Sequence, residues 1–487
     1  MKEKSLKEVA VTSMFWTALQ KYVLLGVTFI SSIVLARLLT PYDYGCIGML
    51  EIFITIATIM IEGGFGSALL QKKMPSEEDY STVFYWNLFL SAFFYLVLFF
   101  SAPAIARFYN IPILSNVLRI QGLVLFVNAF KMIPSNKLRK NFRFRPIAIV
   151  NVVSSVFSVS VAIVMAYRGY GVWALVAQYF LIAFLPMIAF WFITKWKPLW
   201  NFSKKSFMGL FRFGGFMLLT DLVNTISSNI QGLLIGRVYT PATMGYYSKA
   251  KTTEGIAASG ISQVVSTVSY QLYAEVQDDF TALTNILRRI TSAIAFLTIP
   301  LIITLILTAE PIFIILYSDR WLPCVPYFRV LAFASFPICL QAVNLQSIAA
   351  IGRSKSMFSW TLIKRLLDIV LIVGGLMLYG INGLLYGMVI SAWMAFFINS
   401  WLVSKHIGYK LNKQFLNLLP IVLLSIITII PSLLYHLVFS FNIYLDAIIE
   451  SGLFLSLYIG GSVVMKLDAY SYCKDTVHSI INKRRHK

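Results

Sequence analysis

The chain has 487 residues, of which 58% are hydrophobic and only 13% charged, and its mean hydropathy is +0.77. A soluble protein carries about a quarter charged residues, so this composition excludes an ordinary soluble enzyme and predicts an all-α polytopic membrane protein. The formal net charge is +21. Most lysines and arginines fall in loops on one side of the predicted spans. This bias indicates that the basic charge sets the membrane topology and faces anionic lipid headgroups, and it does not indicate a nucleic-acid partner.

Apolar segments long enough to cross about 30 Å of hydrocarbon recur along the whole chain. The first is too long for a secretory signal and has no small-residue cleavage site, so it is expected to remain as a span. We predict about 14 transmembrane helices, with both termini in the cytoplasm. They lie near 14–39, 45–70, 83–106, 114–133, 147–167, 171–194, 207–236, 248–272, 286–308, 325–350, 357–378, 383–403, 416–438 and 444–465.

A turn motif of the form Arg-x-x-Thr-Pro-x-x-x-Gly occurs twice, at 37–45 and at 237–245. Each copy lies between two long apolar segments, and several shorter motifs repeat in the same order. We therefore predict two six-helix lobes related by a pseudo-twofold axis along the membrane normal. The predicted parts are an N-terminal lobe (1–200), a C-terminal lobe (201–405), and two further spans with a basic cytoplasmic tail (406–487). Repeated bundles of this kind are typical of transporters.

Charged side chains inside spans are the candidate site residues, because their burial in hydrocarbon is costly unless they face a cavity or a partner. Lys21 of the first span has two open interpretations, an ion pair with Glu62 of the second span and a cavity-lining cation for an anionic substrate. The other substrate-binding candidates are basic residues for which snorkelling, helix capping or topology are the structural alternatives. They are Arg37, Arg119, Arg212 and Arg237.

Polar residues of spans two and seven are the candidates for ion coupling or for the cavity wall. Asp221 forms a polar stripe with Asn224 and Gln231. This stripe could line the cavity or bind a coupling ion, and a buried interhelical hydrogen-bond network is the structural alternative. Glu62 precedes a run of glycines at 63, 64 and 66, which indicates either close helix packing or a hinge. The four cysteines and four histidines have no metal-ligand spacing, so no metal, cofactor or catalytic residue is predicted, while coupling to Na⁺ or H⁺ stays open.

The loops argue against two other classes of protein. No loop much exceeds a dozen residues, and there is no GxxxxGK[ST] phosphate loop. The sequence therefore leaves no room for an extramembrane catalytic or nucleotide-binding domain, and predicts neither an enzyme nor an ATP-driven pump.

The chain resembles the polysaccharide flippases of the O-antigen and teichuronic acid type. These belong to the superfamily that also contains the multidrug extruders and the lipid II flippases. The resemblance is carried in order by motifs at 36–41, 66–73, 77–84, 142–144, 171–178, 245–248 and 321–323. The sequence departs from this pattern at Gln231, where relatives often carry an acidic residue. Ion coupling therefore stays open here, with Asp221 as the alternative residue to carry it.

The resemblance implies a flippase that carries an undecaprenyl-diphosphate-linked oligosaccharide across a bacterial inner membrane by alternating access. The partners expected from it are the lipid-linked glycan and membrane lipids, with glycan polymerase machinery as a further candidate. Two alternatives remain, a cation-coupled multidrug exporter and, less favoured, a membrane glycan polymerase or ligase.

Overall fold

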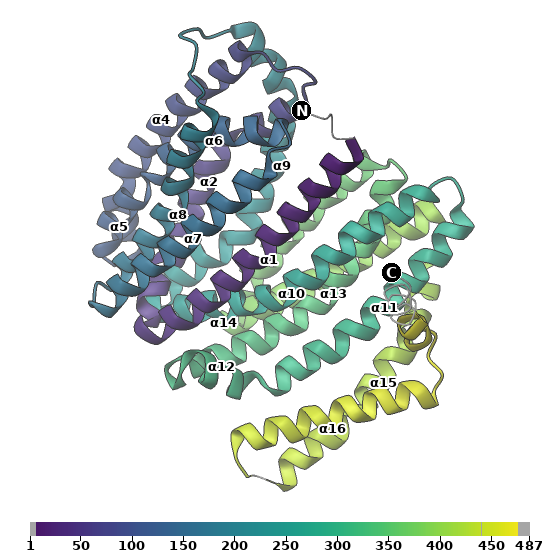
Figure 1. Cartoon of the computed structure of the whole chain (residues 1–487). Coiled ribbons are helices and arrows are strands. Elements are labelled where there is room, and N and C mark those ends of the chain that lie inside the picture. The colour runs from purple at the N-terminus through teal and green to yellow at the C-terminus, as the bar shows by residue number, and fades with distance from the viewer. Residues whose placement is uncertain (1–5, 440, 476–487) are drawn as a thin grey trace. The chain divides into compact units, whose positions relative to one another are not determined.

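The computed structural model describes residues 6–439 and 441–475, and every regular element in that part of the chain is a helix. The contacts within the chain divide it into two units, Met1–Ser248 and Lys249–Lys487. Each unit has its own helices (Figure 1). Each unit also has its own hydrophobic clusters. The prediction of an all-α polytopic membrane protein is confirmed.

The first unit is built from the N-terminal helices. They are α1 (Leu6–Leu38), α2 (Pro41–Glu62), α3 (Phe65–Gln71), α4 (Glu77–Tyr109), α5 (Ile113–Gln121), α6 (Val124–Lys140), α7 (Phe144–Tyr167), α8 (Val172–Thr194), α9 (Lys204–Val238) and the start of α10 (Pro241–Glu275). Helix α9, which the sequence assigns to the second lobe, packs against α2, α3 and α4 within this unit. The predicted lobe boundaries stay predictions.

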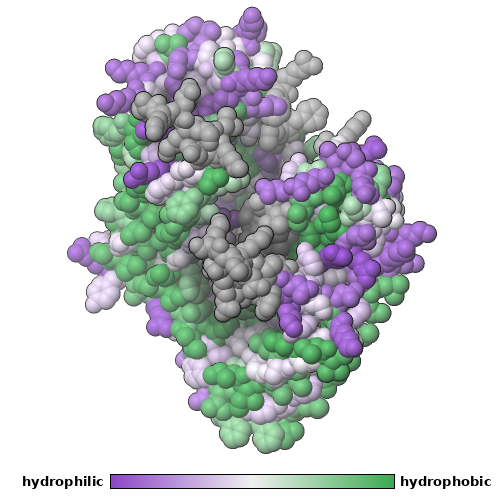
Figure 2. All heavy atoms as spheres, turned by 45° about the vertical axis from the view of Figure 1, so that its right-hand side comes forward, coloured by the Kyte–Doolittle hydropathy of each residue, from purple (hydrophilic) through white to green (hydrophobic). Residues whose placement is uncertain are grey.

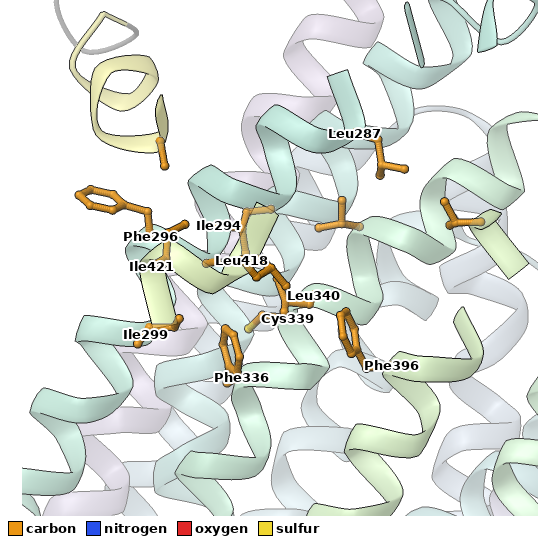
Figure 3. Packing of buried hydrophobic residues seen from close by; sticks show 14 of the residues in the cluster. Leu287, Ile294, Phe296, Ile299, Phe336, Cys339, Leu340, Phe396, Leu418 and Ile421 are labelled. Carbon is orange, nitrogen blue, oxygen red and sulfur yellow. The ribbon is translucent and has the colours of Figure 1, made fainter. Parts of the chain in front are cut away.

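The second unit contains the rest of α10 and the elements that follow it. They are α11 (Phe280–Leu307), α12 (Ala309–Tyr317), η1 (Asp319–Cys324), α13 (Val325–Ala350), α14 (Ser354–Ile407), α15 (Leu411–Val438) and α16 (Ile443–Val464). Figure 3 shows its core, in which side chains of α11, α13, α14 and α15 meet, among them Phe296, Phe336 and Phe396. Helices α15 and α16 pack against each other. The side chains at the lower edge of Figure 2 are mainly hydrophobic.

Eleven helical segments within the described residues are long and apolar enough to cross a membrane. One of them, Ser356–Ile407, contains a break, because Tyr379 and Gly380 leave the helical conformation. This segment therefore holds both spans predicted at 357–378 and 383–403. Helices α9 and α10, at the places of predicted spans seven and eight, are not among the eleven. The count of 14 stays a prediction.

Both copies of the turn motif start a helix with a threonine N-cap, and in the first copy the Asp43 backbone N–H donates to Thr40 Oγ1 at 3.4 Å. In the first copy Thr40 Oγ1 donates to Asp43 Oδ2 at 2.6 Å, and the Thr40 backbone N–H donates to the same oxygen at 2.9 Å. In the second copy the Thr243 backbone N–H donates to Thr240 Oγ1 at 3.2 Å. A threonine N-cap followed by proline at the first helical position satisfies orphan amide groups and fixes the backbone for the helix.

The segment 195–203, which connects α8 to α9, is bound along its length to the start of α4. Trp196 Nε1 donates to Glu77 Oε2 at 2.8 Å, and the Leu199 backbone N–H donates to Ser81 Oγ at 2.8 Å. Further on, the Ser203 backbone N–H donates to Thr82 Oγ1 at 3.0 Å. We call this segment the α8–α9 strap. It fixes the first turn of α9 to the first unit.

Candidate functional site

A polar cavity of about 350 Å³ opens within the first unit, between α2, α3, α6 and α9. Its wall combines small, amide, hydroxyl and charged side chains with a few apolar ones. The lining residues are Ile59, Glu62, Gly64, Gly66, Ser67, Leu70, Asn128, Lys131, Met132, Ser135, Asn136, Arg139 and Asp221. A wall this polar is unusual within membrane helices, where unpaired polar groups are strongly disfavoured.

Four charged residues line this cavity, the carboxylates of Glu62 and Asp221 and the cations of Lys131 and Arg139. Lys131 and Arg139 attract the charge of Glu62, and Asp221 repels it. Within the described part of the chain, none of the four side chains forms a hydrogen bond or an ion pair shorter than 4.0 Å. Their charges sum to zero, yet each keeps its hydrogen-bonding capacity for a ligand.

The glycine run at 63, 64 and 66 shapes the cavity wall. Helix α2 ends at Glu62 because Gly63 (φ 53°) and Gly64 (φ 71°) both adopt the left-handed region. Two successive residues in that region strongly favour glycine, since a Cβ would be strained there. The break therefore places the end of α2 at the cavity, where Glu62, Gly64 and Gly66 all line the wall.

One face of α6 supplies the basic side of the cavity. Asn128, Lys131, Ser135 and Arg139 recur at intervals of three or four residues, so they form one stripe along the helix. This stripe is the sequence signal by which Lys131 and Arg139 could have been found. The sequence analysis did not include Lys131 and Arg139 among the candidate site residues. It assigned basic residues near the end of a span to the membrane topology.

A second, smaller pocket lies beside the polar cavity and shares Glu62, Asn128 and Met132 with it. Thr58 of α2 and Asn87 of α4 also line this pocket, which is too narrow to admit a water molecule. The Asn87 side chain is fully buried, and within the described residues its Oδ1 atom has no hydrogen-bond partner.

The structure brings two of the predicted polar residues, Glu62 and Asp221, to the same cavity. Asn224 and Gln231 are not among its lining residues. Gln231 is buried elsewhere on α9, where its Nε2 donates to the Ser227 carbonyl at 3.1 Å and its Oε1 finds no partner among the described residues. Gln231 therefore belongs to the packing of α9.

The predicted basic residues lie outside this cavity. Arg119 stacks over the Phe99 ring at 4.5 Å and donates from Nε to the Phe99 carbonyl at 3.4 Å. Arg237 lies over the Phe108 ring at 5.0 Å. Lys21 and Arg37 are exposed on α1, and within the described residues Lys21 forms no ion pair with Glu62. Arg212 belongs to α9, and its side chain lies outside the described part of the structure.

The second unit holds a different kind of cavity, of about 480 Å³, between α11–α13 and α15–α16. Aliphatic residues, among them Ile306, Leu307 and Leu433, make up about half of its wall, and the charged residues Glu310, Arg329, Asp446 and Glu450 also line it. Its charged residues include Arg329, whose guanidinium pairs with Glu310 at 3.2 Å. The wall of this cavity therefore combines aliphatic and charged surface.

Known proteins resemble the chain in sequence and in fold. A family described as "Polysaccharide biosynthesis protein" matches residues 34–326. The teichuronic acid biosynthesis protein TuaB of Bacillus subtilis is 24% identical over 417 residues, which is 83% of this chain and 84% of that protein. The succinoglycan biosynthesis transport protein ExoT of Rhizobium meliloti is 24% identical over 349 residues, which is 72% of this chain and 71% of that protein.

Among solved structures, the lipid II flippase MurJ in an inward closed conformation matches with a TM-score of 0.72 and 16% identity. The match covers 94% of this chain and 99% of that one. At this identity the likeness concerns the fold.

Proposed function

Since this chain belongs to the family of polysaccharide biosynthesis proteins, we propose that it is a flippase. Its cargo is an oligosaccharide linked to a polyprenyl diphosphate, such as undecaprenyl diphosphate. It carries this cargo from the cytoplasmic to the outer face of a bacterial inner membrane, with both of its own termini in the cytoplasm. The protein moves the glycan lipid by alternating access and catalyses no covalent step.

The polar cavity of the first unit is the observation that carries this proposal. A glycan head with phosphates cannot cross hydrocarbon unaided, because ions and unpaired polar groups are disfavoured there by several kcal/mol. The cavity offers charged and hydrogen-bonding groups in place of water. Their lack of direct partners within the described residues supports a site that receives a polar cargo.

Each side of the cavity suits one part of such a head group. The planar guanidinium of Arg139 can bind two phosphate oxygens at once, and the ammonium of Lys131 adds a compact positive charge. The carboxylates of Glu62 and Asp221 and the amide of Asn128 are suited to accept hydrogen bonds from sugar hydroxyls. Because two carboxylates balance the two cations, the diphosphate is held most strongly when one carboxylate charge is neutralised.

The cavity of the second unit is our candidate for the lipid part of the cargo. The aliphatic part of its wall, which includes Ile306, Leu307 and Leu433, can accommodate part of a polyprenyl chain. Burial of apolar surface there is worth about 25 cal/mol per Å². The two C-terminal helices would then serve lipid binding, which is a role for the part of the chain that has no counterpart in the repeat.

The test measures on which face of the membrane the lipid-linked oligosaccharide lies. It uses deletion cells and the same cells complemented with a variant of the protein. The double variant Lys131→Ala/Arg139→Ala should let the glycan lipid accumulate on the cytoplasmic face, as deletion does. The matched control is Lys73→Ala/Arg143→Ala, which removes two exposed cations outside the cavity and should retain export. Normal export in the deletion strain would refute the proposal.

Two other outcomes would assign the protein to another class. Export of organic cations with no change in glycan-lipid sidedness would identify a multidrug exporter. Extension of glycan chains by the purified protein would identify a polymerase.

A further inference from the structure

Helix α14 of the second unit folds back on itself at the break at 379–380, so its two halves run antiparallel. The contacts between the halves follow one another in register. Ser356 Oγ lies 3.3 Å from His406 Nε2, and one turn further in the Trp360 and Trp401 rings lie 5.1 Å apart. A third contact, one turn deeper, involves a lysine that the proposed function does not use.

This lysine, Lys364, lies deep within the helix pair. It follows the start of α14 at Ser354 by ten residues, which is about 15 Å along the helix axis. The residue therefore belongs to the interior of a hydrocarbon layer of about 30 Å, where a charge is costly unless it faces a partner or a cargo. Lys364 Nζ donates to Asn399 Oδ1 at 2.7 Å, and this bond holds the ammonium at depth instead of letting it extend toward the headgroups.

The orientation of Asn399 indicates that an acceptor is missing beside it. Its side chain is buried, with 1% of the residue exposed. Because an ammonium can only donate, Lys364 fixes the amide oxygen Oδ1 toward itself, and the amide nitrogen Nδ2 is left over. Among the described residues this buried Nδ2 has no hydrogen-bond acceptor. A buried donor without an acceptor is disfavoured, and turning the amide over would place two donors against each other.

The charge around Lys364 is positive as well. Arg365 lies near enough to repel the charge of the ammonium. Within the described chain no carboxylate lies within 4.0 Å of Lys364 Nζ, and Asp368, one turn further along the helix, forms no ion pair with it. Two neighbouring donors, the ammonium and the Asn399 amide, therefore face no negative charge of the protein.

The end of the helix pair is also basic. Arg353 directly precedes α14 and Lys405 lies in its last turn, and both repel a positive charge on His406. Lys405 Nζ also lies over the Trp401 ring, 5.2 Å from its centroid. An anion that approaches from this end, which the predicted topology places in the cytoplasm, therefore meets cations at the entrance and again at Lys364.

We propose that Lys364 and the Asn399 amide form a second phosphate site, which takes the diphosphate of the glycan lipid during its passage. Two oxygens on one phosphorus can accept from Lys364 Nζ and Asn399 Nδ2 at once, because Nδ2 and the oxygen bound to Lys364 belong to the same amide. Lys364 is half-buried on a flexible stem, so an anion reaches the pair when that stem moves. The phosphate of a resident phospholipid stays at the membrane surface, so the depth of the site favours a lipid that crosses. The identity of this cargo rests on the proposed function, whereas the anion site does not.

Anion binding is tested on the purified full-length protein by isothermal titration calorimetry with potassium pyrophosphate as the probe. The double variant Lys131→Ala/Arg139→Ala, which removes the cations of the polar cavity, should still bind pyrophosphate. Adding Lys364→Met to it should raise the Kd roughly tenfold or more. Lys413→Met, at an exposed lysine of α15, is the matched control and should leave the Kd unchanged. This comparison holds whether or not the polar cavity itself binds phosphate.

The amide provides a second comparison that keeps the lysine in place. Asn399→Asp retains an acceptor for Lys364 and replaces the free donor with a carboxylate oxygen, so pyrophosphate binding at this site should be lost. Asn412→Asp, at an exposed asparagine of α15, should bind like its parent. Lys364→Arg keeps the positive charge and should retain binding. Unchanged pyrophosphate binding in folded Lys364→Met or in Asn399→Asp would overturn the site.

The source of the phosphate is tested with farnesyl diphosphate, a short polyprenyl diphosphate, and protein in phosphatidylcholine nanodiscs. Farnesyl diphosphate should bind in a manner that depends on Lys364, and phosphatidylglycerol in the nanodisc should not displace it. Displacement would assign the site to a resident phospholipid and overturn its assignment to the cargo.

Transport separates this inference from the proposed function. Lys364→Met should leave more of the glycan lipid on the cytoplasmic face of the membrane than the wild type does. Normal export by Lys364→Met would overturn the role of the site in transport and leave the flippase proposal intact. Pyrophosphate binding that depends on Lys364, in a protein that transports no glycan lipid, would refute the flippase proposal and retain the anion site.

Discussion

The helix that begins at Pro41 approaches the carbonyl oxygen of Pro241 so closely that a Cβ added to Gly45 would overlap that oxygen. The contact is reciprocal, because a Cβ on Gly245 would overlap the carbonyl oxygen of Pro41. Each copy of the repeated turn motif therefore offers a glycine to the proline carbonyl of the other copy. The two copies of the motif therefore pack against each other through the same glycine-to-carbonyl contact.

Gly45→Ala should destabilise the protein by about 1–3 kcal/mol, the usual cost of forcing extra atoms into a packed region. The measurement is the thermal unfolding midpoint of the purified protein. Gly209→Ala is the control, since no atom lies within 4 Å of an added Cβ there and alanine favours the helix by up to about 1 kcal/mol. If both variants unfold at the same temperature, the close approach does not limit stability.

Asp79→Ala should lower the unfolding midpoint more than Asp468→Ala. The buried Asp79 carboxylate accepts from Lys72 Nζ at 2.6 Å and from the Ser76 backbone N–H at 2.7 Å, and loss of such a cap costs about 1–2 kcal/mol. Asp468 forms an exposed ion pair with Arg288 at 3.3 Å, which contributes at most about 1 kcal/mol. The reverse order of midpoints would contradict this account of the α4 start.

Lys21→Ala should abolish glycan-lipid export and leave folding intact. Lys21 is exposed on α1, so its removal creates no core cavity. A charge within a predicted span has a functional role more often than a surface charge does. Export is measured by the sidedness of the lipid-linked oligosaccharide, and folding by the yield of monodisperse protein. Wild-type export by this variant would assign Lys21 a structural role.

Cys473 provides a native probe for the side on which the C-terminal segment lies. It is half-buried after α16, whereas Cys46, Cys324 and Cys339 are fully buried. An impermeant maleimide should label it only after intact cells are opened, and Cys473→Ser should remove the signal. Burial raises the pKa of this thiol, so the thiolate fraction at pH 7 is below that of a free cysteine and labelling should speed up as pH rises. Labelling of intact cells would place this segment outside.

The sequence predicted the helical class, the break at the glycines and two of the cavity carboxylates. It could not tell which polar residues share a site, because that depends on the rotation of each helix against its neighbours. Asp221 and Gln231 illustrate the limit. They lie ten positions apart on α9, which separates them by about 15 Å along the helix axis, so one cavity of this size does not reach both. Lys131 belongs to the site because α6 turns its polar stripe toward α2 and α9, a fact of tertiary packing.

The α8–α9 strap also determines where the chain can be divided into two separately expressed fragments. A cut within 195–203 would divide the strap, whose residues Trp196, Leu199 and Ser203 bond to α4, and would leave α9 held only by its packing against α2, α3 and α4. A cut in the turn between α10 and α11, at 276–279, would keep the strap and the reciprocal glycine contact within one fragment. Two co-expressed fragments should therefore restore export when the chain is divided at 276–279. They should fail to restore it when the chain is divided within 195–203, at the boundary between the two sequence repeats.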